Sequence, residues 1–240
     1  MTNKFILSMA LFCSTTAFAA APFTPEQESR IKEMIRDTLV ENPSILAEAA
    51  DSYNKLAAQV KKDEMAQVLK QNHNTLYEDP ASPRLGASNP ALTLVYFTDY
   101  NCVYCKKFEG VLDRLIKEHP DVAVVIKPLP YRSESSLTAA QLALTIWKKQ
   151  PQNFVALHER LMAKKGNHDD RSIAETLKKV GISEIKPEPK SQDTVNINLS
   201  LAQNLGVQGT PATLVGNTLV SGAVPYEELE RVVREAKKSK

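Results

Sequence analysis

Two cysteines separated by two residues are the part of this 240-residue chain best suited to chemistry. In Cys102-Val103-Tyr104-Cys105, an exposed thiolate at Cys102 can attack a disulfide, and Cys105 can release the resulting mixed disulfide. Metal binding and a purely structural role remain alternatives at this point. Zinc normally takes four ligands and the sequence has no second such pair, whereas Cu(I) favours soft sulfur ligands and would accept the two thiolates of Cys102 and Cys105. Redox chemistry is the favoured interpretation.

The elements expected around the cysteines explain how Cys102 would be activated. Residues 91–98 form an apolar, β-prone run, residues 102–119 carry apolar side chains at helical spacing, and residues 122–126 form a second apolar run. This order predicts a strand, a helix and a parallel strand, with Cys102 at the helix N-terminus. Unpaired backbone N–H groups and the helix dipole stabilise an anion there, so the pKa of Cys102 should be low.

The N-terminus has the features of a signal peptide. Residues 1–4 are cationic, residues 5–18 are mostly apolar, and Ala17-Phe18-Ala19 fits a cleavage site. The apolar run is shorter than the ~20 residues that span a bilayer. We expect residues 1–19 to be removed together with Cys13, which leaves Cys102 and Cys105 in an exported protein. A disulfide closing so short a loop would add little stability, which again favours redox chemistry.

Composition excludes some functions. The chain has 30 Lys and Arg against 28 Asp and Glu, with a net charge of +2, so there is no general electrostatic case for nucleic acid binding. The four histidines, 73, 119, 158 and 168, show no ligand spacing and are expected at the surface. Lys106 stands where a c-type haem motif needs histidine, and no cofactor is indicated.

Residues 20–77 are predicted to form an N-terminal helical arm. Thr24 is a candidate N-cap, and Asn42-Pro43 ends one helix and begins the next. The second helix carries an apolar seam at 3-4-3-4 spacing, formed by Leu46, Ala49, Tyr53, Leu56 and Val60. The arm either wraps around the body or pairs with copies of itself. We favour a homo-oligomer, dimer or trimer, formed through residues 24–75.

The rest of the chain is predicted to be one α/β body. Turn-forming residues indicate a linker at 78–90, and the body follows at 91–240. A mainly helical block is expected at about 133–206, before a hairpin at 212–220 and an amphipathic helix at 225–238.

This order of elements, with Gly209-Thr210-Pro211 before the hairpin, resembles the thioredoxin fold with a helical insertion found in the DsbA family of periplasmic thiol oxidoreductases. The resemblance implies a periplasmic location and a cis Thr210-Pro211 bond beside the cysteines. It also implies that the backbone of Thr210 pairs with substrate peptide like an added strand. Val103 and Tyr104 would contact the substrate and tune the redox potential.

Residues 97–106 and Glu41-Asn42-Pro43 look more specifically like the suppressor-of-copper-sensitivity C (ScsC) proteins and Com1-like relatives. This resemblance implies an oligomeric disulfide isomerase or reductase that acts on disulfide-containing client proteins. A membrane reductase of the DsbD/ScsB type would keep Cys102 and Cys105 reduced. The alternatives are a monomeric DsbA-type dithiol oxidase and a Cu(I)-sequestering copper-tolerance protein.

One residue departs from the family pattern. Thioredoxin-fold enzymes usually carry a buried acid six residues before the first cysteine, and this chain has Tyr96 there. Asp99 is a weak substitute because it lies on the loop rather than in the strand. The proton acceptor for Cys105 is therefore not identified by the sequence.

Overall fold

A computed structural model describes residues 23–182 and 185–238. The expected signal peptide, residues 1–19, lies outside this range. The chain divides into two units, Met1–Gln59 and Val60–Lys240. Each unit is described by itself.

The first unit is helical, as expected for the arm. Helix α1 (Pro25–Glu41) begins with a capping box in which Thr24 and Gln27 exchange side-chain and backbone hydrogen bonds. Helix α2 (Ser44–Gln71) starts directly after Asn42-Pro43 and continues into the second unit. The side chains of the apolar seam are exposed, with Tyr53 at 71% and Leu56 at 65%. No helix in the described part of the chain combines the length and apolar character needed to span a membrane.

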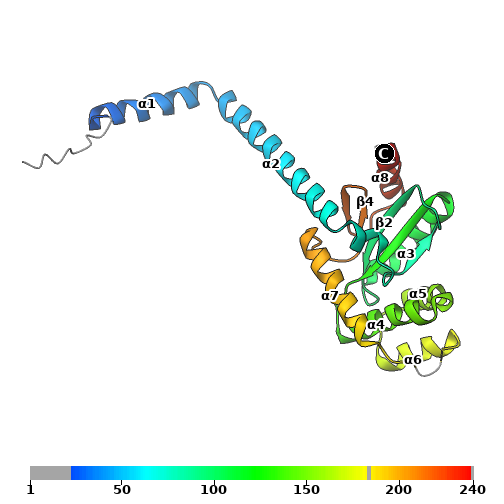
Figure 1. Ribbon diagram of the computed structural model, residues 1–240. Helices are drawn as coiled ribbons and strands as arrows, with labels where there is room; N and C mark the ends of the chain where they lie inside the picture. Colours follow the sequence, from blue (N-terminus) through cyan, green and yellow to red (C-terminus); the bar gives the residue numbers. More distant parts are fainter. Residues whose placement is uncertain (1–22, 183–184, 239–240) are drawn as a thin grey trace, which may run out of the picture. The chain divides into compact units, whose positions relative to one another are not determined.

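The second unit is built on a five-stranded sheet with the order β1-β3-β2-β4-β5 (Figure 1). Strands β2 (Leu92–Thr98) and β3 (Val122–Pro128) are parallel and are joined by helix α3 (Val103–Glu118). The hairpin β4 (Ala212–Val215) and β5 (Thr218–Ser221) extends the sheet, and helix α8 (Tyr226–Lys238) follows. This arrangement confirms the expected α/β thioredoxin fold.

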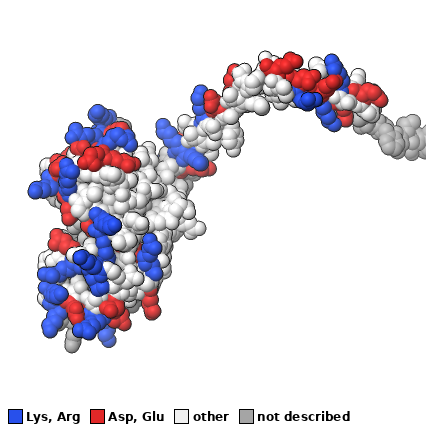
Figure 2. Space-filling model, turned by 180° about the vertical axis from the view of Figure 1, so that it is seen from behind, with Lys and Arg blue, Asp and Glu red and all other residues white. Residues whose placement is uncertain are grey.

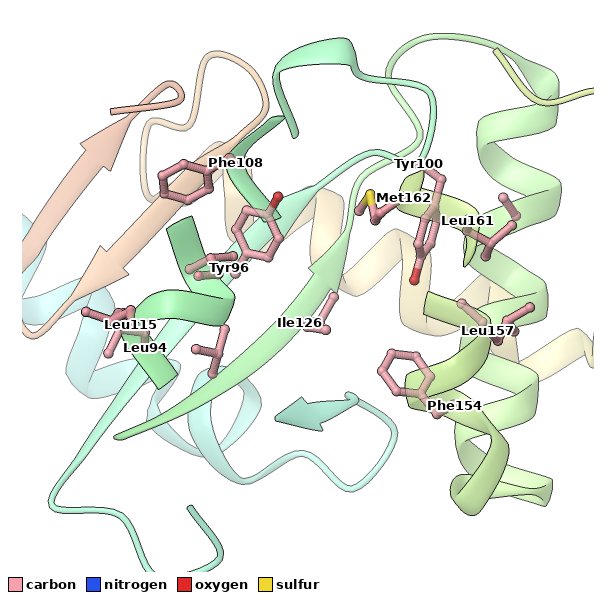
Figure 3. Packing of buried hydrophobic residues seen from close by; sticks show 14 of the residues in the cluster. Leu94, Tyr96, Tyr100, Phe108, Leu115, Ile126, Phe154, Leu157, Leu161 and Met162 are labelled. Carbon is pink, nitrogen blue, oxygen red and sulfur yellow. The ribbon is translucent and has the colours of Figure 1, made fainter. Parts of the chain in front are cut away.

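The two faces of the sheet are buried by different helices because side chains alternate along each strand. On one face, Leu94 and Tyr96 of β2 pack with Phe108 and Leu115 of α3, as Figure 3 shows. The opposite face belongs to a second cluster formed by β2, β4, α7 (Pro189–Asn204), the end of α2 and the turn after it. Its members include Leu69, Leu76, Val95, Phe97, Leu201, Leu205 and Leu214. The central strand is thus buried on both sides, as its continuous apolar run predicts.

The helical block lies between β3 and β4 in the sequence, as expected. It contains α4 (Glu134–Lys149), the short 3₁₀ turn η2 (Pro151–Asn153), α5 (Phe154–Ala163), α6 (Asp170–Lys179) and α7. Figure 1 shows α4, α5 and α6 gathered beside the sheet. Helix α5 contacts both α3 and α6, and α7 contacts β3, so the block is packed against the helix that carries the cysteines.

The segment 78–90, expected as a linker, is instead part of the folded body. The π-helical turn η1 (Asn74–Glu78) buries Leu76, and strand β1 (Arg84–Gly86) pairs with β3. Gly86 adopts a positive φ of 85°, and a Cβ at this position would collide with the carbonyl oxygen of Val122. The linker prediction was wrong here because a strand of three residues is too short to show a periodic pattern.

Buried Lys127 of β3 holds this segment in place. Its Nζ donates to the carbonyl oxygen of Thr75 at 2.6 Å and to Oγ of Ser82 at 2.7 Å, and it lies 3.5 Å from Oδ2 of Asp79. Burial lowers the pKa of Lys127 to about 8. Within the second unit, η1 and the turn after it are therefore tied to the sheet by one buried side chain.

Candidate active site

Cys102 is the N-cap residue of α3, which is the position expected from the sequence. Its backbone is extended, with φ −80° and ψ 116°, and its Sγ accepts the backbone N–H of Cys105 at 3.4 Å. Both Cys102 and Cys105 are free thiols. The helix therefore begins with its unpaired N–H groups directed at the first sulfur.

The segment before β4 reaches the same sulfur from the other side. As a thiol, Cys102 donates to the carbonyl oxygen of Thr210 at 3.2 Å. The Thr210-Pro211 bond is cis, in agreement with the expectation, and Pro211 is buried. The structure thus brings Cys102, Cys105 and Thr210 together although Thr210 is 108 residues from Cys102 in the chain.

The surroundings of the two thiols shift their pKa values in opposite directions. The pKa of Cys102 is lowered to about 5, chiefly by a hydrogen bond from the thiol of Cys105 and further by backbone N–H groups and the Thr210 hydroxyl, while burial opposes this effect. Burial and the same hydrogen bond to Cys102 raise the pKa of Cys105. At neutral pH this arrangement favours a thiolate at Cys102, the form that can act as a nucleophile, and a neutral thiol at Cys105.

The predicted nucleophile, Cys102, is not exposed, contrary to expectation. Cys102 is buried, whereas Val103 and Tyr104 beside it are 54% and 56% exposed. The reason is that its sulfur lies between the first turn of α3 and the Thr210 backbone, two elements far apart in sequence. Val103 and Tyr104 form the surface that an approaching disulfide would meet first.

Asp99 fixes the loop between β2 and α3. This buried carboxylate accepts three backbone N–H groups, from Asn101 at 2.7 Å, Tyr131 at 2.8 Å and Arg132 at 2.9 Å. These bonds occupy both of its oxygens. Asp99 is therefore a structural clamp for the loop that presents Cys102, rather than a free substitute for the missing acid.

Asn101 ties the same loop to the helical block, a role that the sequence did not reveal. Its amide nitrogen donates to Oγ of Ser133 and of Ser135, both at 2.8 Å, and its amide oxygen accepts the backbone N–H of His168 at 2.6 Å. The local sequence around Asn101 does not indicate these contacts, because the residues that Asn101 bonds to lie more than 30 positions away in the chain.

Two histidines expected at the surface are buried, so that expectation was wrong. His158 Nδ1 lies 3.0 Å from the hydroxyl of Tyr100 and its Nε2 lies 3.1 Å from Oε2 of Glu109. His168 Nε2 donates to the carbonyl oxygen of Leu161 at 2.8 Å. The helical spacing of Phe154, His158 and Leu161 could have placed His158 on the buried stripe of α5. Among the described residues no cluster of three or more His, Cys, Asp or Glu could hold a metal ion.

A basic hollow of about 390 Å³ lies next to the cysteine helix. Four lysines line it together with Val103, Met162 and the turn at Gly166: Lys106, Lys107, Lys164 and Lys165. Figure 2 shows lysine and arginine side chains gathered on one side of the body, with acidic side chains among them. The hollow contains no acidic lining residue, so its charge is positive.

Comparison with known proteins gives two family matches. Residues 93–234 match the DSBA-like thioredoxin domain, and residues 27–59 match the copper resistance protein ScsC N-terminal domain. Among curated sequences, disulfide bond formation protein D of Bacillus subtilis is 24% identical over 173 residues, covering 66% of this chain and 78% of that protein.

Solved structures agree with both matches. The catalytic domain of Proteus mirabilis ScsC is 49% identical, with a TM-score of 0.70 over 72% of this chain and 98% of that chain. P. mirabilis ScsC in a transitional conformation is 46% identical, with a TM-score of 0.71 over 91% of this chain and 100% of that chain. A periplasmic thioredoxin-like protein from Salmonella enterica serovar Typhimurium is 52% identical, with a TM-score of 0.67 over 69% of this chain and 95% of that chain.

Proposed function

Because this chain belongs to the DsbA-like thioredoxin family and is a thiol-disulfide oxidoreductase of the DsbA/ScsC type, we propose that it works in the periplasm as an oligomeric disulfide isomerase or reductase. The observation that carries the chemistry is Cys102 at the N-cap of α3, bonded by the N–H of Cys105 and in contact with Thr210. The periplasmic location is supported by the likeness to the periplasmic Salmonella protein.

The reaction begins when the Cys102 thiolate attacks a client disulfide. A Cys102–client disulfide forms and one client sulfur leaves as a thiolate. In the reductase reaction, Cys105 loses its proton and attacks Cys102, so the enzyme disulfide forms and the second client thiolate leaves. In the isomerase reaction, another client thiol attacks the mixed disulfide instead, which makes a new client disulfide and regenerates the Cys102 thiolate. The low pKa of Cys102 supports both reactions because it makes this sulfur a good leaving group.

Client proteins would bind along the Thr210 backbone, beside Val103 and Tyr104. Thr210 is half-buried and Gly209 before it is exposed, so an extended client segment can approach this edge. The adjacent basic hollow would favour clients with acidic residues near the target cysteine.

Isomerase or reductase work requires a reduced dithiol in an oxidising compartment. We therefore infer a membrane reductase partner of the DsbD/ScsB type. The redox state of Cys102 and Cys105 in cells, measured by trapping thiols with a mass-tagged alkylating reagent, distinguishes the options. A reduced pair supports our proposal, whereas an oxidised pair supports a DsbA-type oxidase.

The arm would form the oligomer. Its exposed Tyr53 and Leu56 and the ScsC match at residues 27–59 support this role. Several active sites would then face one misfolded client. The deletion that tests the arm must end at Gln59, because Leu69 and Leu76 belong to the core of the second unit.

The experiment is the refolding of scrambled ribonuclease by residues 20–240 and by residues 60–240. We expect faster recovery of activity with the longer chain and comparable insulin reduction by both, because the dithiol is unchanged. Equal ribonuclease recovery would contradict the role of the arm.

Copper sequestration is a second candidate, favoured by the copper-resistance description of the N-terminal match and by two adjacent thiols. Titration of reduced protein with Cu(I), alongside a Cys102→Ser variant, tests it. Tight binding that is lost in the variant, with no disulfide exchange by the unaltered protein, would replace our proposal.

A further inference from the structure

The resolving step needs a group that takes a proton from Cys105. Burial raises the pKa of this thiol, so it is neutral when the mixed disulfide forms. Its thiolate is nevertheless the form that attacks Cys102. The strand position where an acid was expected holds Tyr96, which is fully buried, and Asp99 is occupied by backbone N–H groups.

Glu109 is a partly buried acid on the same helix. It lies four residues after Cys105, and its Oε1 is buried without a hydrogen-bond partner among the described residues. A buried carboxylate oxygen without a partner costs free energy, which points to a functional reason for keeping it.

Two hydroxyl groups lie between Cys105 and Glu109. The hydroxyl of Thr98 donates to that of Tyr96 at 3.0 Å, and it lies within hydrogen-bonding reach of the Cys105 sulfur. In the mixed disulfide Cys102 is no longer a thiolate, so the Cys105 thiol can turn its proton from Cys102 to the Thr98 oxygen. The pKa of Tyr96 is raised by burial and further by the nearby charges of Glu109 and Cys105. Tyr96 therefore lies near both groups, packed against Phe108 as Figure 3 shows.

The other oxygen of Glu109 is held in place. Tyr100 donates to Nδ1 of His158 when the ring carries its proton on Nε2, and Nε2 then donates to Oε2 of Glu109 at 3.1 Å. This leaves Oε1 for the Tyr96 hydroxyl, which lies within hydrogen-bonding reach of the Glu109 carboxylate. In Figure 3, Tyr100 lies beside the α5 residues Leu157 and Leu161.

Glu109 also has a route to solvent. It lines a small hollow of about 170 Å³. The titratable and charged groups around Glu109 are Lys106 and Asp113 of α3, His158 and Glu159 of α5, Tyr96 of β2 and Tyr100 of the β2–α3 loop. A proton that reaches Glu109 can leave through this hollow.

We propose that Glu109 replaces the missing strand acid and accepts, through Thr98 and Tyr96, the proton that Cys105 loses in the resolving step. The Cys105 proton moves to Thr98, the Thr98 proton to Tyr96 and the Tyr96 proton to Glu109. The Cys105 thiolate then attacks Cys102, the enzyme disulfide forms, and the client sulfur leaves with the electron pair of the broken bond. Glu109 is a positioning residue here, because it acts through the two hydroxyls. The inference rests on the proposed thiol-disulfide exchange but not on its direction or on oligomerisation.

The test measures the release of coloured thiolate when the reduced full chain reacts in a single turnover with the aromatic disulfide dithiobis(nitrobenzoate). Attack by Cys102 releases the first coloured thiolate, and resolution by Cys105 releases the second. We expect Glu109→Gln to slow the second release at least about tenfold at neutral pH, because the proton acceptor is lost, and to leave the first release unchanged. The second release should then become steeply faster with rising pH.

Matched variants distinguish a loss of proton transfer through Thr98 and Tyr96 from a structural effect of the substitution. Tyr96→Phe should slow the second release as Glu109→Gln does, and Glu109→Asp should restore part of the rate. Glu175→Gln, which removes an exposed carboxylate from α6, should change neither phase. An unchanged rate and pH profile of the second release in Glu109→Gln, or an equal slowing of both phases, would overturn the inference. The absence of a second release in the unaltered chain would instead refute the proposed oxidoreductase function.

Discussion

At the scale of single residues, Cys102 and Cys105 have the same side chain and opposite proton affinities. Cys102 receives hydrogen bonds from the start of α3, whereas Cys105 is buried one turn inside the helix and donates to Cys102. The difference comes from position alone. The two sulfurs therefore have different roles in the proposed reaction. Cys102 attacks and leaves easily, whereas Cys105 resolves the mixed disulfide only after it loses a proton.

The pKa of Cys102 has a measurable consequence for reactivity and stability. We expect the thiolate absorbance of the reduced protein to titrate with a midpoint near pH 5. Because the folded pKa lies below the ordinary thiol value of 9.0, this group should stabilise the reduced protein increasingly as the pH rises from 5 towards 9. That stabilisation is lost as the pH falls through 5.

Cys102→Ser is the control, and it should abolish the midpoint near pH 5. Urea unfolding of the reduced protein at pH 4 and pH 7 should show a smaller difference in the variant than in the unaltered chain. A midpoint between pH 8 and 9 in the unaltered chain would contradict this description of the site.

Thr213 offers a test of unpaired polar groups. Its Oγ1 is buried and has no hydrogen-bond partner within residues 23–182 and 185–238. By contrast, Oγ1 of Thr145 donates to the carbonyl oxygen of Gln141 at 2.7 Å and accepts the N–H of Glu188 at 3.0 Å. We expect Thr213→Val to raise the free energy of unfolding by about 1 kcal/mol and Thr145→Val to lower it by about 1–3 kcal/mol. Chemical denaturation measures both; the same sign for the two variants would contradict the assignment.

At the scale of elements, the loop between β2 and α3 decides where the helix that carries the cysteines begins. Asp99 fastens this loop to the chain after β3, and Asn101 fastens it to the helical block. The parallel β2–β3 pair and the insertion thus converge on one short segment. The N-cap position of Cys102 depends on these long-range contacts as well as on the local tendency to form a helix.

Removal of the Asp99 carboxylate should therefore destabilise the folded protein. We expect Asp99→Ala to lower the free energy of unfolding by about 2–3 kcal/mol, because the charge-assisted bonds to three N–H groups are lost. Asp169→Ala removes an exposed N-cap carboxylate from α6 and should lower the free energy of unfolding by much less. Urea unfolding compares the two, and an equal or smaller effect of Asp99→Ala would refute the role of the clamp.

At the scale of the whole molecule, the second unit buries its apolar residues and the first does not. Helix α1 has no buried residue, and the α2 seam exposes Leu46, Tyr53 and Leu56. A repeated apolar seam without a partner is typical of a helix that associates with other copies. This is the physical basis for the proposed oligomer.

A single charge should disrupt that association. We expect Leu56→Glu to reduce the mass measured by light scattering to that of one subunit, because a carboxylate would be buried in the seam. Ala58→Glu adds the same charge about 200° around the helix and should leave the mass unchanged. A single-subunit mass for the unaltered protein would exclude the oligomer.

Features that depend on neighbouring residues could be predicted from the sequence. These features are the start of a helix at Cys102, the break at Asn42-Pro43, the strands expected at 91–98 and 122–126, and the helical block. All of them are set by spacing, capping and proline geometry, which act over a few residues. The prediction of the fold is therefore confirmed, and Cys102 and Cys105 stay the predicted centre of the site.

Other features were decided only by contacts between distant segments. Strand β1 exists because it pairs with β3, His158 is buried because α5 packs on α3, and Asp99 is occupied because residues 131 and 132 return to it. The sequence does not distinguish Glu109 from the other charged residues of its helix, and only tertiary packing places it near Tyr96. The sequence determined which residues could do the chemistry, and the folded structure decided their protonation and their partners, because both depend on desolvation and on hydrogen bonds that no local pattern encodes.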